Sequence, residues 1–379
     1  MTTPARTVLL DATSVPPDRG GVGRYLDGII PALAARGSSV TVVCKPEDAE
    51  HFRRSGLPVL TAPASTTSVA RRFLWEQVAL PGIARRAGAH TIHSPHYTFP
   101  LLTRRARVVT VHDLTFFSHP ELHTPVKRLF FRTWVRLSRL FRTVVVAPSS
   151  ATASEYVRIT GADEARVVVA LHGYDHDQFH RPTAAEVAGF SASLTPAPER
   201  WVAFLGTLEP RKNVVPLIEA FETATAGSPA GERPSLLLAG GPGWDTGIDP
   251  AISAAVSRGV DVRKLGYLPL GDLSAFLGGA QIVAYPSLGE GFGLPVLEAM
   301  ATGACVVTTR RLALPEVGGD AVEYTGIDAP SIAATLASLL QDPAERDRLG
   351  TAALERAGEF TWARCAASHT EAYERAGAR

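Results

Sequence analysis

The chain has 379 residues, 45% hydrophobic and 20% charged, with a formal net charge of +1. This composition is typical of a globular protein with a sizeable core and excludes a disordered chain, and the length predicts two domains at about 100–200 residues each. Cys44, Cys305 and Cys365 are far apart, which excludes C-x-x-C metal pairs and argues against a disulfide framework. The first apolar run stops at Asp11 and no later run is long enough to span a bilayer, so we expect a cytoplasmic protein.

The charge is distributed unevenly along the chain. Residues 1–190 contain 23 Lys or Arg and 15 Asp or Glu, whereas the remainder contains 15 and 22. The basic half is suited to an anionic partner, such as a lipid surface or a phosphorylated acceptor, although attraction between two domains would produce the same asymmetry.

Short β-branched runs alternate with helical segments along most of the chain. The expected strands in the first half are 7–12, 39–44, 89–94, 108–113, 143–148 and 167–172, and those in the second half are 201–206, 235–240, 262–267, 281–286 and 304–309. Strands that are apolar on both faces and separated by helices predict two parallel sheets, each covered on both sides. Ligands of such sheets bind beyond the carboxyl ends of the strands.

The first loop of interest follows the first strand. Gly20, Gly21 and Gly23 precede a helix expected to start near Arg24, so a phosphate or a sugar could approach the main chain there. A dinucleotide fingerprint fails because Leu26 stands at the third glycine position. A plain tight turn is the alternative.

Residues 124–143 read as a basic amphipathic helix. One side carries Val126, Phe130, Trp134, Leu137 and Phe141, and another carries Arg128, Arg132, Arg136 and Arg139. We expect the apolar side to pack on the first sheet. The arginines could also contact an anionic membrane.

Residues 173–200 are rich in proline, serine and polar residues and read as the crossover between domains, with a boundary near residue 185. This segment contains Asp175-His176-Asp177, which we interpret as a chance D-x-D and not as a metal site.

The segment GTLEPRKN places Arg211 and Lys212 between a strand and a helix. Two adjacent cations there can hold a diphosphate, the guanidinium by paired hydrogen bonds and the ammonium as a point charge. A solvated basic loop is the alternative.

The segment GEGFGLPVLEAMATG places Glu290 in a loop and Glu298 about one turn inside a helix over 294–302 that ends at Gly303. Gly291 and Gly293 leave main-chain amides free to face a ligand between two carboxylate acceptors, an arrangement suited to sugar hydroxyls. A capping or ion-pairing role for Glu298 is the alternative.

GTLEPRKN and GEGFGLPVLEAMATG together resemble the nucleotide-sugar half of retaining GT-B glycosyltransferases of the large family with an E-x7-E motif, the family four type. GGVGRY, VHDLTFFSHPE, APSSATASEYV and HGYDHDQFHRP extend this resemblance over nearly the whole chain. It implies two doubly wound, Rossmann-like α/β domains that face each other across a cleft. The expected ranges are 1–185 for the acceptor and 186–360 for the nucleotide sugar, with a helix in 361–379 that crosses back to the first domain.

The resemblance also implies roles for individual residues. Lys212 matches the lysine that neutralises the leaving diphosphate, with Arg211 as its partner, although Thr207 stands where many members have an arginine after the glycine. Glu290 would approach hydroxyls of the transferred sugar, Glu298 would bind the ribose, and His112 would lie near the sugar. The implied catalytic residues are His112, Arg211, Lys212 and Glu290, the implied donor-binding residues are Gly21, Gly23, Gly206, Arg211, Lys212, Glu290, Gly291, Phe292, Gly293, Leu294 and Glu298, and the implied acceptor-binding residues are Tyr25 and Asp113.

The expected function is retaining transfer of a hexose, with mannose from GDP-mannose favoured, to a glycan or a polyprenyl- or lipid-linked acceptor. No metal or other cofactor is expected, because Arg211 and Lys212 can stabilise the departing charge themselves. No nucleic acid partner is expected, and the location would be cytoplasmic or peripheral at the inner face of the membrane. The alternatives are a nucleotide-sugar epimerase of the same fold and a non-catalytic subunit that binds nucleotide or membrane.

Overall fold

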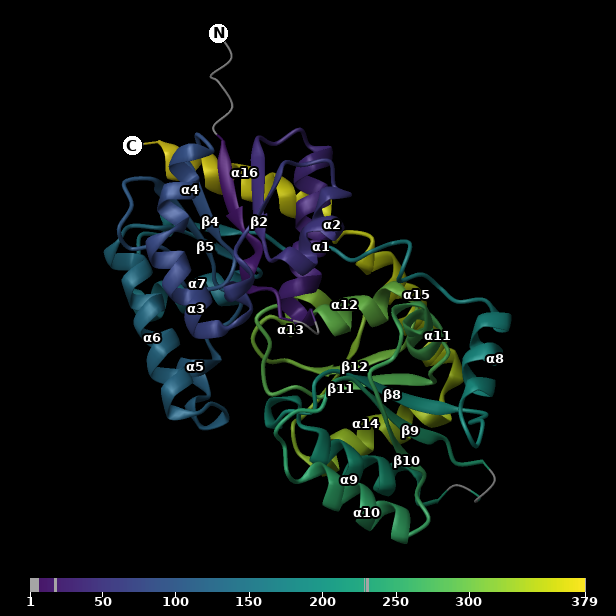
Figure 1. Cartoon of the computed structure of the whole chain (residues 1–379). Coiled ribbons are helices and arrows are strands. Elements are labelled where there is room, and N and C mark those ends of the chain that lie inside the picture. The colour runs from purple at the N-terminus through teal and green to yellow at the C-terminus, as the bar shows by residue number, and fades with distance from the viewer. Residues whose placement is uncertain (1–6, 17–18, 228, 230–231, 379) are drawn as a thin grey trace. The chain divides into compact units, whose positions relative to one another are not determined.

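The computed structural model describes residues 7–16, 19–227, 229 and 232–378 (Figure 1). The chain divides into two compact units: unit 1 combines residues 1–173 with 361–379, and unit 2 spans Tyr174–Phe360. The division thus falls before the expected boundary at residue 185. Residues 178–180 group with unit 2 because Ser274 Oγ donates to Gln178 O at 2.7 Å and accepts from His180 N at 3.1 Å.

Unit 1 is built on a parallel sheet of seven strands in the order β3-β2-β1-β4-β5-β6-β7. Its strands are β1 (Val8–Asp11), β2 (Val40–Cys44), β3 (Val59–Thr61), β4 (Thr91–Ser94), β5 (Ala106–Thr110), β6 (Val144–Ala147) and β7 (Val167–Val169). Its helices are α1 (Gly20–Ala35), α2 (Ala49–Arg53), α3 (Val69–Val78), α4 (Leu80–Arg86), α5 (Thr115–Ser118), α6 (Pro125–Leu140), α7 (Ser150–Thr160) and α16 (Trp362–Gly377).

Alternating side chains of one strand enter different cores of unit 1. In β6, Val144 and Val146 pack in the core that α1 and α16 cover, whereas Val145 packs with Trp134 and Tyr156 of α6 and α7. Side chains of a strand point to opposite faces by turns, so a sheet covered on both sides needs apolar residues at every position. The valine run of β6 meets this need.

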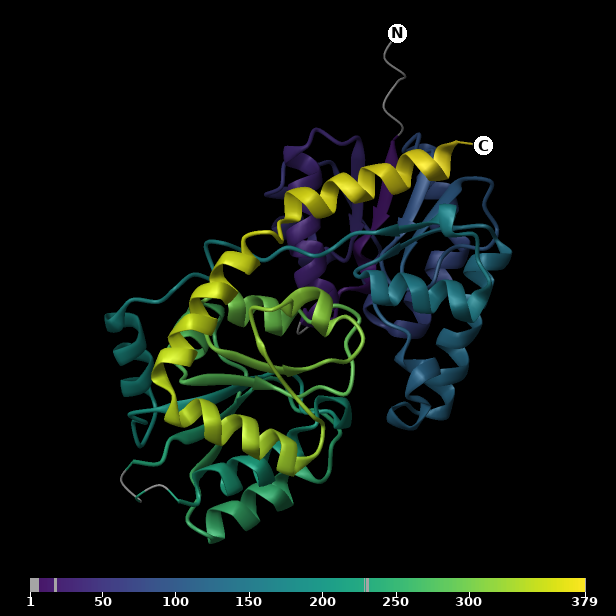
Figure 2. The same ribbon diagram turned by 180° about the vertical axis from the view of Figure 1, so that it is seen from behind.

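The last helix of the chain belongs to unit 1. Figure 2 shows α16 (yellow) beside elements from the start of the chain (purple and blue), and Cys365, Ala366, Ala372, Tyr373 and Ala376 are buried in the same core as α1. A Cβ on Gly28 would collide with the Trp362 ring, so this ring of α16 packs directly on the main chain of α1. Residues separated by more than 300 positions therefore share one core.

Unit 2 contains a second parallel sheet of six strands in the order β10-β9-β8-β11-β12-β13. Its strands are β8 (Trp201–Leu205), β9 (Ser235–Ala239), β10 (Val262–Gly266), β11 (Ile282–Tyr285), β12 (Val306–Thr309) and β13 (Glu323–Thr325). Its helices are α8 (Ala184–Ser193), α9 (Val214–Thr225), α10 (Ile248–Ser257), α11 (Leu273–Gly278), α12 (Leu294–Ala301), α13 (Leu314–Gly318), α14 (Ala329–Gln341) and α15 (Pro343–Ala357).

The structure confirms the two doubly wound α/β sheets and corrects two details. All eleven expected strands are present, and β3 and β13 add an edge strand of three residues to each sheet. Helix α1 begins at Gly20, so Gly21 and Gly23 lie in its first turn and do not precede it. Within the described part of the chain, no helix is long and apolar enough to cross a membrane.

Candidate active site

The clustered polar side chains of unit 2 lie at the carboxyl edge of its sheet. Strand β8 leads through a short 3-10 helix, η6 (Pro210–Lys212), into α9, and β11 leads through residues 286–293 into α12. Because β8 and β11 are neighbours in the sheet, the two loops meet beyond the strand ends. The Leu288 amide donates to Arg211 O at 2.8 Å and joins them.

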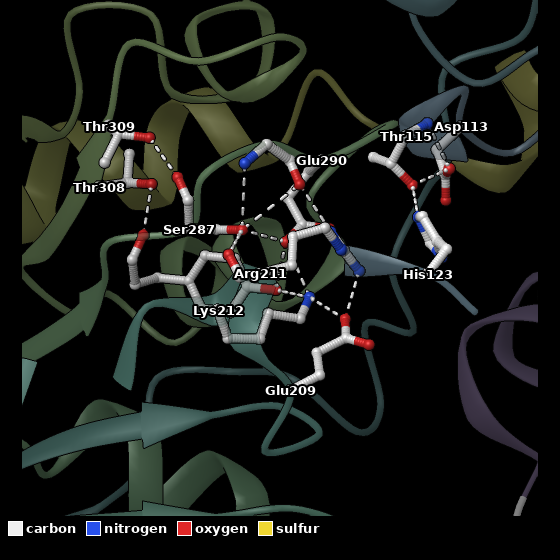
Figure 3. A network of polar contacts seen from close by, with 12 residues as sticks. Asp113, Thr115, His123, Glu209, Arg211, Lys212, Ser287, Glu290, Thr308 and Thr309 are labelled. Carbon is white, nitrogen blue, oxygen red and sulfur yellow. Dashed lines mark hydrogen bonds and ion pairs between the residues drawn. The ribbon is translucent and has the colours of Figure 1, made fainter. Parts of the chain in front are cut away.

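Arg211, Lys212 and Glu290 form one ion-pair network (Figure 3). Lys212 Nζ donates to Glu290 Oε1 at 2.7 Å, and Arg211 Nη1 lies 2.5 Å from Glu290 Oε2, so the carboxylate bridges both cations. Arg211 Nη2 also donates to Glu209 Oε1 at 2.6 Å. Two cations and two carboxylates thus meet within hydrogen-bond distance.

The network is nearly closed to solvent. Glu290, Lys212 and Glu209 are each at most 8% exposed. Burial alone would raise the pKa of Glu290, but attraction to Arg211 and Lys212 outweighs it and lowers the pKa to about 2. Burial and the neighbouring Arg211 charge lower the pKa of Lys212, against the opposing pull of Glu290 and Glu209.

Two hydroxyl groups fix the position of Glu290. Ser287 Oγ donates to Glu290 Oε1 at 2.6 Å, and Tyr285 OH accepts from Lys212 Nζ and donates to the same oxygen at 3.1 Å. Thr308 and Thr309 of β12 in turn donate to the carbonyls of Tyr285 and Ser287 at 2.9 and 2.7 Å (Figure 3). The strand ends therefore hold this loop in one conformation.

The second glutamate lies inside α12, as its spacing predicts. Gly293 is the N-cap residue directly before this helix and has φ = 104°, a left-handed conformation that disfavours a side chain. Glu298 is 3% exposed and lies on the next turn, and Phe292 is also buried. At the neighbouring strand ends, a Cβ on Gly240 would collide with the main chain of Gly206, so these loops pass each other at main-chain distance.

The predicted site residues of unit 1 lie at the carboxyl edge of its own sheet. His112 follows β5, and its Nε2 lies 2.7 Å from Pro95 O, which can only accept, so Nε2 carries the proton. Burial lowers the pKa of His112, which favours a neutral ring with a lone pair on Nδ1.

Asp113 takes part in a second polar chain in unit 1. Asp113 Oδ1 accepts from Thr115 N at 3.0 Å and from Thr115 Oγ1 at 2.7 Å, and His123 Nε2 lies 2.9 Å from the same hydroxyl (Figure 3). Since the hydroxyl proton goes to Asp113, His123 Nε2 donates to Thr115. Asp113 is thus oriented at the start of α5.

Of the three predicted residues near the glycine turn, Tyr25 is positioned differently from the expectation. Tyr25 has no exposed surface, and its hydroxyl bonds to His369 and Thr110 inside the core, which argues against direct contact with an acceptor and makes its role structural. A Cβ on Gly23 would collide with the Arg19 side chain, so close packing alone explains a glycine at this position. Gly21 is exposed on the first turn of α1.

The arginines predicted for a membrane lie on α6, but three of them also contact other parts of unit 1. Arg132 Nε donates to Phe116 O at 2.7 Å and Arg139 Nε to Gly161 O at 3.1 Å, while Arg132 and Arg136 lie over the Phe117 ring. The expected apolar side is also divided, since Trp134 is buried and Val126 is 79% exposed.

The D-x-D tripeptide forms an exposed turn. Asp175 Oδ1 accepts from the main-chain amides of Asp177 and Gln178 at 3.0 and 3.2 Å. Its carboxylate therefore caps its own turn. Among the residues that the structure describes, no group of three or more metal-ligating side chains is assembled.

Sequence reasoning missed three members of the unit 2 network: Glu209, Tyr285 and Ser287. Glu209 stands two positions before Arg211 in the segment GTLEPRKN. An acidic side chain so close to two cations in the sequence could have indicated an ion pair. Tyr285 reads as an ordinary strand residue, so no local pattern could have identified it.

Comparison with known proteins assigns the chain to a family. The family model described as Glycosyltransferase Family 4 matches residues 19–178, and that described as Glycosyl transferases group 1 matches residues 190–356. The O-antigen chain mannosyltransferase B of Escherichia coli is 31% identical over 286 residues, which are 74% of this chain and 73% of that protein. The chain belongs to the family 4 glycosyltransferases.

Other relatives of this glycosyltransferase agree with the assignment. A D-inositol 3-phosphate glycosyltransferase of Kineococcus radiotolerans is 32% identical over 61% of this chain and 57% of its own. The crystal structure of Anabaena Alr3699/HepE in complex with UDP and glucose superimposes with a TM-score of 0.75 at 19% identity, covering 97% of this chain and 99% of that one. The two Rossmann-like units are therefore those of a GT-B glycosyltransferase.

Proposed function

We propose that this glycosyltransferase moves a mannosyl group from GDP-mannose to a glycan or a lipid-linked acceptor, with retention of the anomeric configuration and without a metal. The observation that carries the proposal is the buried Arg211–Lys212 pair beside Glu290 at the carboxyl edge of unit 2. The mannosyltransferase name of the Escherichia coli relative supports mannose.

In this proposal the two cations act on the leaving group. When the bond from the anomeric carbon to the phosphate oxygen breaks, its electron pair stays on the nucleoside diphosphate and positive charge develops on the sugar. Arg211 and Lys212 would stabilise the departing diphosphate in a site that excludes water. Glu209 and Glu290 neutralise these cations beforehand, so the incoming phosphates compete with carboxylates and not with water.

The remaining residues would hold the two reactants. Glu290 and the amides of residues 291–293 would accept and donate hydrogen bonds to the sugar, and Glu298 would bind the ribose. His112, with its lone pair on Nδ1, would orient a sugar hydroxyl, and Asp113 would bind the acceptor. The acceptor hydroxyl attacks the anomeric carbon from the face that the diphosphate leaves, and its proton passes to the departing phosphate oxygen.

The test is turnover on a panel of GDP-, UDP- and ADP-sugars with Lys212→Met and Glu290→Gln. Both substitutions keep side-chain volume while removing charge. We expect GDP release to fall by about 100- to 1,000-fold with Lys212→Met, the cost of one lost donor to a developing oxyanion. It should also fall with Glu290→Gln, which removes the carboxylate that accepts from Lys212 and would accept from the sugar. Lys264→Met is the matched control, because Lys264 is an exposed lysine of unit 2 that pairs with Asp249. Equal turnover in the three variants would refute the site.

The same experiment separates the two rival functions. Release of a free sugar epimer without a glycosylated product would identify an epimerase. Nucleotide binding in calorimetry without turnover on any acceptor would identify a non-catalytic subunit.

A further inference from the structure

Helix α3 places one carboxylate in the interior of unit 1. Glu76 is 1% exposed, and its Oε2 accepts from Thr98 Oγ1 at 2.7 Å and from Arg72 Nη1 at 3.1 Å. Gln77 Nε2 donates to the other oxygen, Oε1, at 3.2 Å. Both oxygens of Glu76 therefore accept hydrogen bonds, and one of the three donors comes from outside α3.

Packing alone does not explain an acidic residue at this position. Burial and the nearby carboxylate of Asp11 raise the pKa of Glu76 to about 7, against the attraction of Arg72. A buried ion pair adds little net stability, and an apolar side chain of similar size often serves a core equally well. What the carboxylate adds is a defined geometry, because its donors are all satisfied in one arrangement.

The donor from outside α3 belongs to the segment 95–101, which follows β4 and forms neither a helix nor a strand. Besides the bond that Thr98 makes, Gln77 donates to Phe99 O at 3.0 Å and accepts from Leu101 N at 3.0 Å. Two adjacent residues of one helix thus hold this segment at three points.

The same segment fixes two of the predicted site residues of unit 1. His112 Nε2 donates to Pro95 O at 2.7 Å, and this bond sets the tautomer of the ring. Tyr97 OH accepts from Asp113 N at 3.0 Å and donates to Asp113 O at 3.2 Å. The orientation of both site residues therefore depends on the position of segment 95–101.

The backbone of Tyr97 shows that contacts hold this segment in place. Its φ of 55° is left-handed, which is uncommon for a residue with a side chain and persists where the surroundings determine it. Tyr97 N also donates to Thr110 O at 3.2 Å, at the end of β5. Loss of a bond from α3 should therefore allow the segment to relax.

We infer that Glu76 is a positioning residue for His112 and Asp113. Segment 95–101 transmits its effect, and Glu76 itself touches neither reactant. The inference rests on the proposed function for the roles of the two site residues. The orientation of the His112 ring can be measured without donor or acceptor, so the inference and the proposed function can fail separately.

The test is NMR of the full chain with ¹⁵N-labelled histidine, applied to Thr98→Val and Glu76→Leu. In the parent, the Nε2 proton of His112 should exchange slowly, because it is bonded to Pro95 O, and its absence from His112→Gln identifies it. In both variants this proton should exchange at least about tenfold faster, the effect of removing one buried hydrogen bond.

Thr98→Ser and Thr143→Val are the matched controls. Thr98→Ser retains the hydroxyl that donates to Glu76 and should protect the His112 proton as the parent does. Thr143 is another threonine of unit 1 that is 3% exposed, and its hydroxyl donates to Ser138 O at 3.0 Å. Denaturant unfolding should show a similar loss of stability in Thr143→Val and Thr98→Val, but Thr143→Val should leave the His112 proton protected.

Turnover provides a second measurement on the same variants. Thr98→Val and Glu76→Leu should lower kcat by up to about 100-fold, because a small misplacement of a group at the reacting centre is costly. KM for GDP-mannose should change less, because the cations that would hold its diphosphate lie in unit 2. Thr98→Ser should restore kcat.

Two results would overturn the inference. The His112 proton would be as protected in Thr98→Val and Glu76→Leu as in the parent, or kcat would be unchanged in a variant whose His112 proton exchanges faster. Thr98→Val decides the question if circular dichroism shows that Glu76→Leu does not fold. If the parent turns over no sugar nucleotide, the proposed function fails, and exchange of the His112 proton still decides whether Glu76 positions the ring.

Discussion

At the residue scale, the candidate site is a balanced set of charges. Arg211 and Lys212 are matched by Glu209 and Glu290 in a part of unit 2 that is nearly closed to solvent. Removing one member leaves an uncompensated buried charge, which costs more than the loss of the pair itself. Truncation to alanine would add a cavity to this loss of charge balance, so substitutions that preserve shape are preferable.

The lowered pKa of Glu290 predicts a dependence of stability on pH. Its pKa is about 2 in the folded protein and 4.5 in a free side chain, so the carboxylate contributes stability that is present above about pH 4.5. That contribution should disappear as pH falls from about 4.5 to about 2. Denaturant unfolding should show the parent losing stability relative to Glu290→Gln over this range, and a constant difference would contradict the ion pairing.

Residue identities could be predicted where they followed a recognisable strand end. Arg211, Lys212, Glu290 and Glu298 were found because short sequence segments place them at the edge of a parallel sheet. Tyr285 and Ser287 could not be predicted in the same way, because their roles depend on the contact of two loops about 75 positions apart.

At the element scale, a buried series of hydrogen bonds joins α16 to the rest of unit 1. His369 Nδ1 donates to Cys365 O at 2.8 Å, so its neutral ring accepts from Tyr25 OH at 2.6 Å. Tyr25 OH lies 3.1 Å from Thr110 Oγ1, and His93 Nε2 lies 2.9 Å from that hydroxyl. One assignment satisfies every atom: His93 donates to Thr110, and Thr110 donates to Tyr25.

The buried hydrogen bonds around His369 predict that unit 1 loses stability in acid. Burial lowers the pKa of His369 to about 4, from 6.5 in a free side chain, so the neutral ring contributes stability that is present above about pH 6.5. The contribution should be lost as pH falls from about 6.5 to about 4, at about 1.4 kcal/mol per pH unit. Unfolding curves of His369→Gln should be flatter over this range, and an equal slope would contradict the prediction.

Removal of one hydroxyl tests the same chain at neutral pH. Tyr25→Phe keeps the ring but leaves His369 Nε2 and Thr110 without their common partner, so we expect a loss of about 1–3 kcal/mol in unfolding free energy. Tyr324→Phe is a control in unit 2, where the hydroxyl donates to Gly319 O in a part-buried hydrogen bond. If both variants lost the same unfolding free energy, the buried hydrogen bonds of Tyr25 would contribute no more stability than the single bond of Tyr324.

Elements were predictable in proportion to their length and apolar content. The central strands were found because β-branched runs are buried on both faces, whereas β3 and β13 are three residues long and mostly not buried. The inner side of α6 was assigned partly incorrectly, because two apolar stripes share one helix and only tertiary contacts decide which one is buried.

At the scale of the whole molecule, the two units differ in how the chain builds them. Unit 2 is one continuous segment, Tyr174–Phe360, whereas unit 1 needs residues 361–379 as well as 1–173. A chain that ends at residue 360 should therefore lose hydrogen-exchange protection in β4, β5 and β6, which α16 contacts, and retain it in unit 2. GDP binding should persist, and protected strands in unit 1 of the shortened chain would contradict this dependence.

Because unit 1 combines two segments that are distant in the sequence, the chain cannot fold strictly in the order of its synthesis. Domains generally fold as they leave the ribosome, beginning from the N-terminus. Here the partner of Tyr25 is translated 344 residues later, so the first half must wait for the end of the chain while the second half can already be complete. The part of the protein that is made first is thus the last to become native.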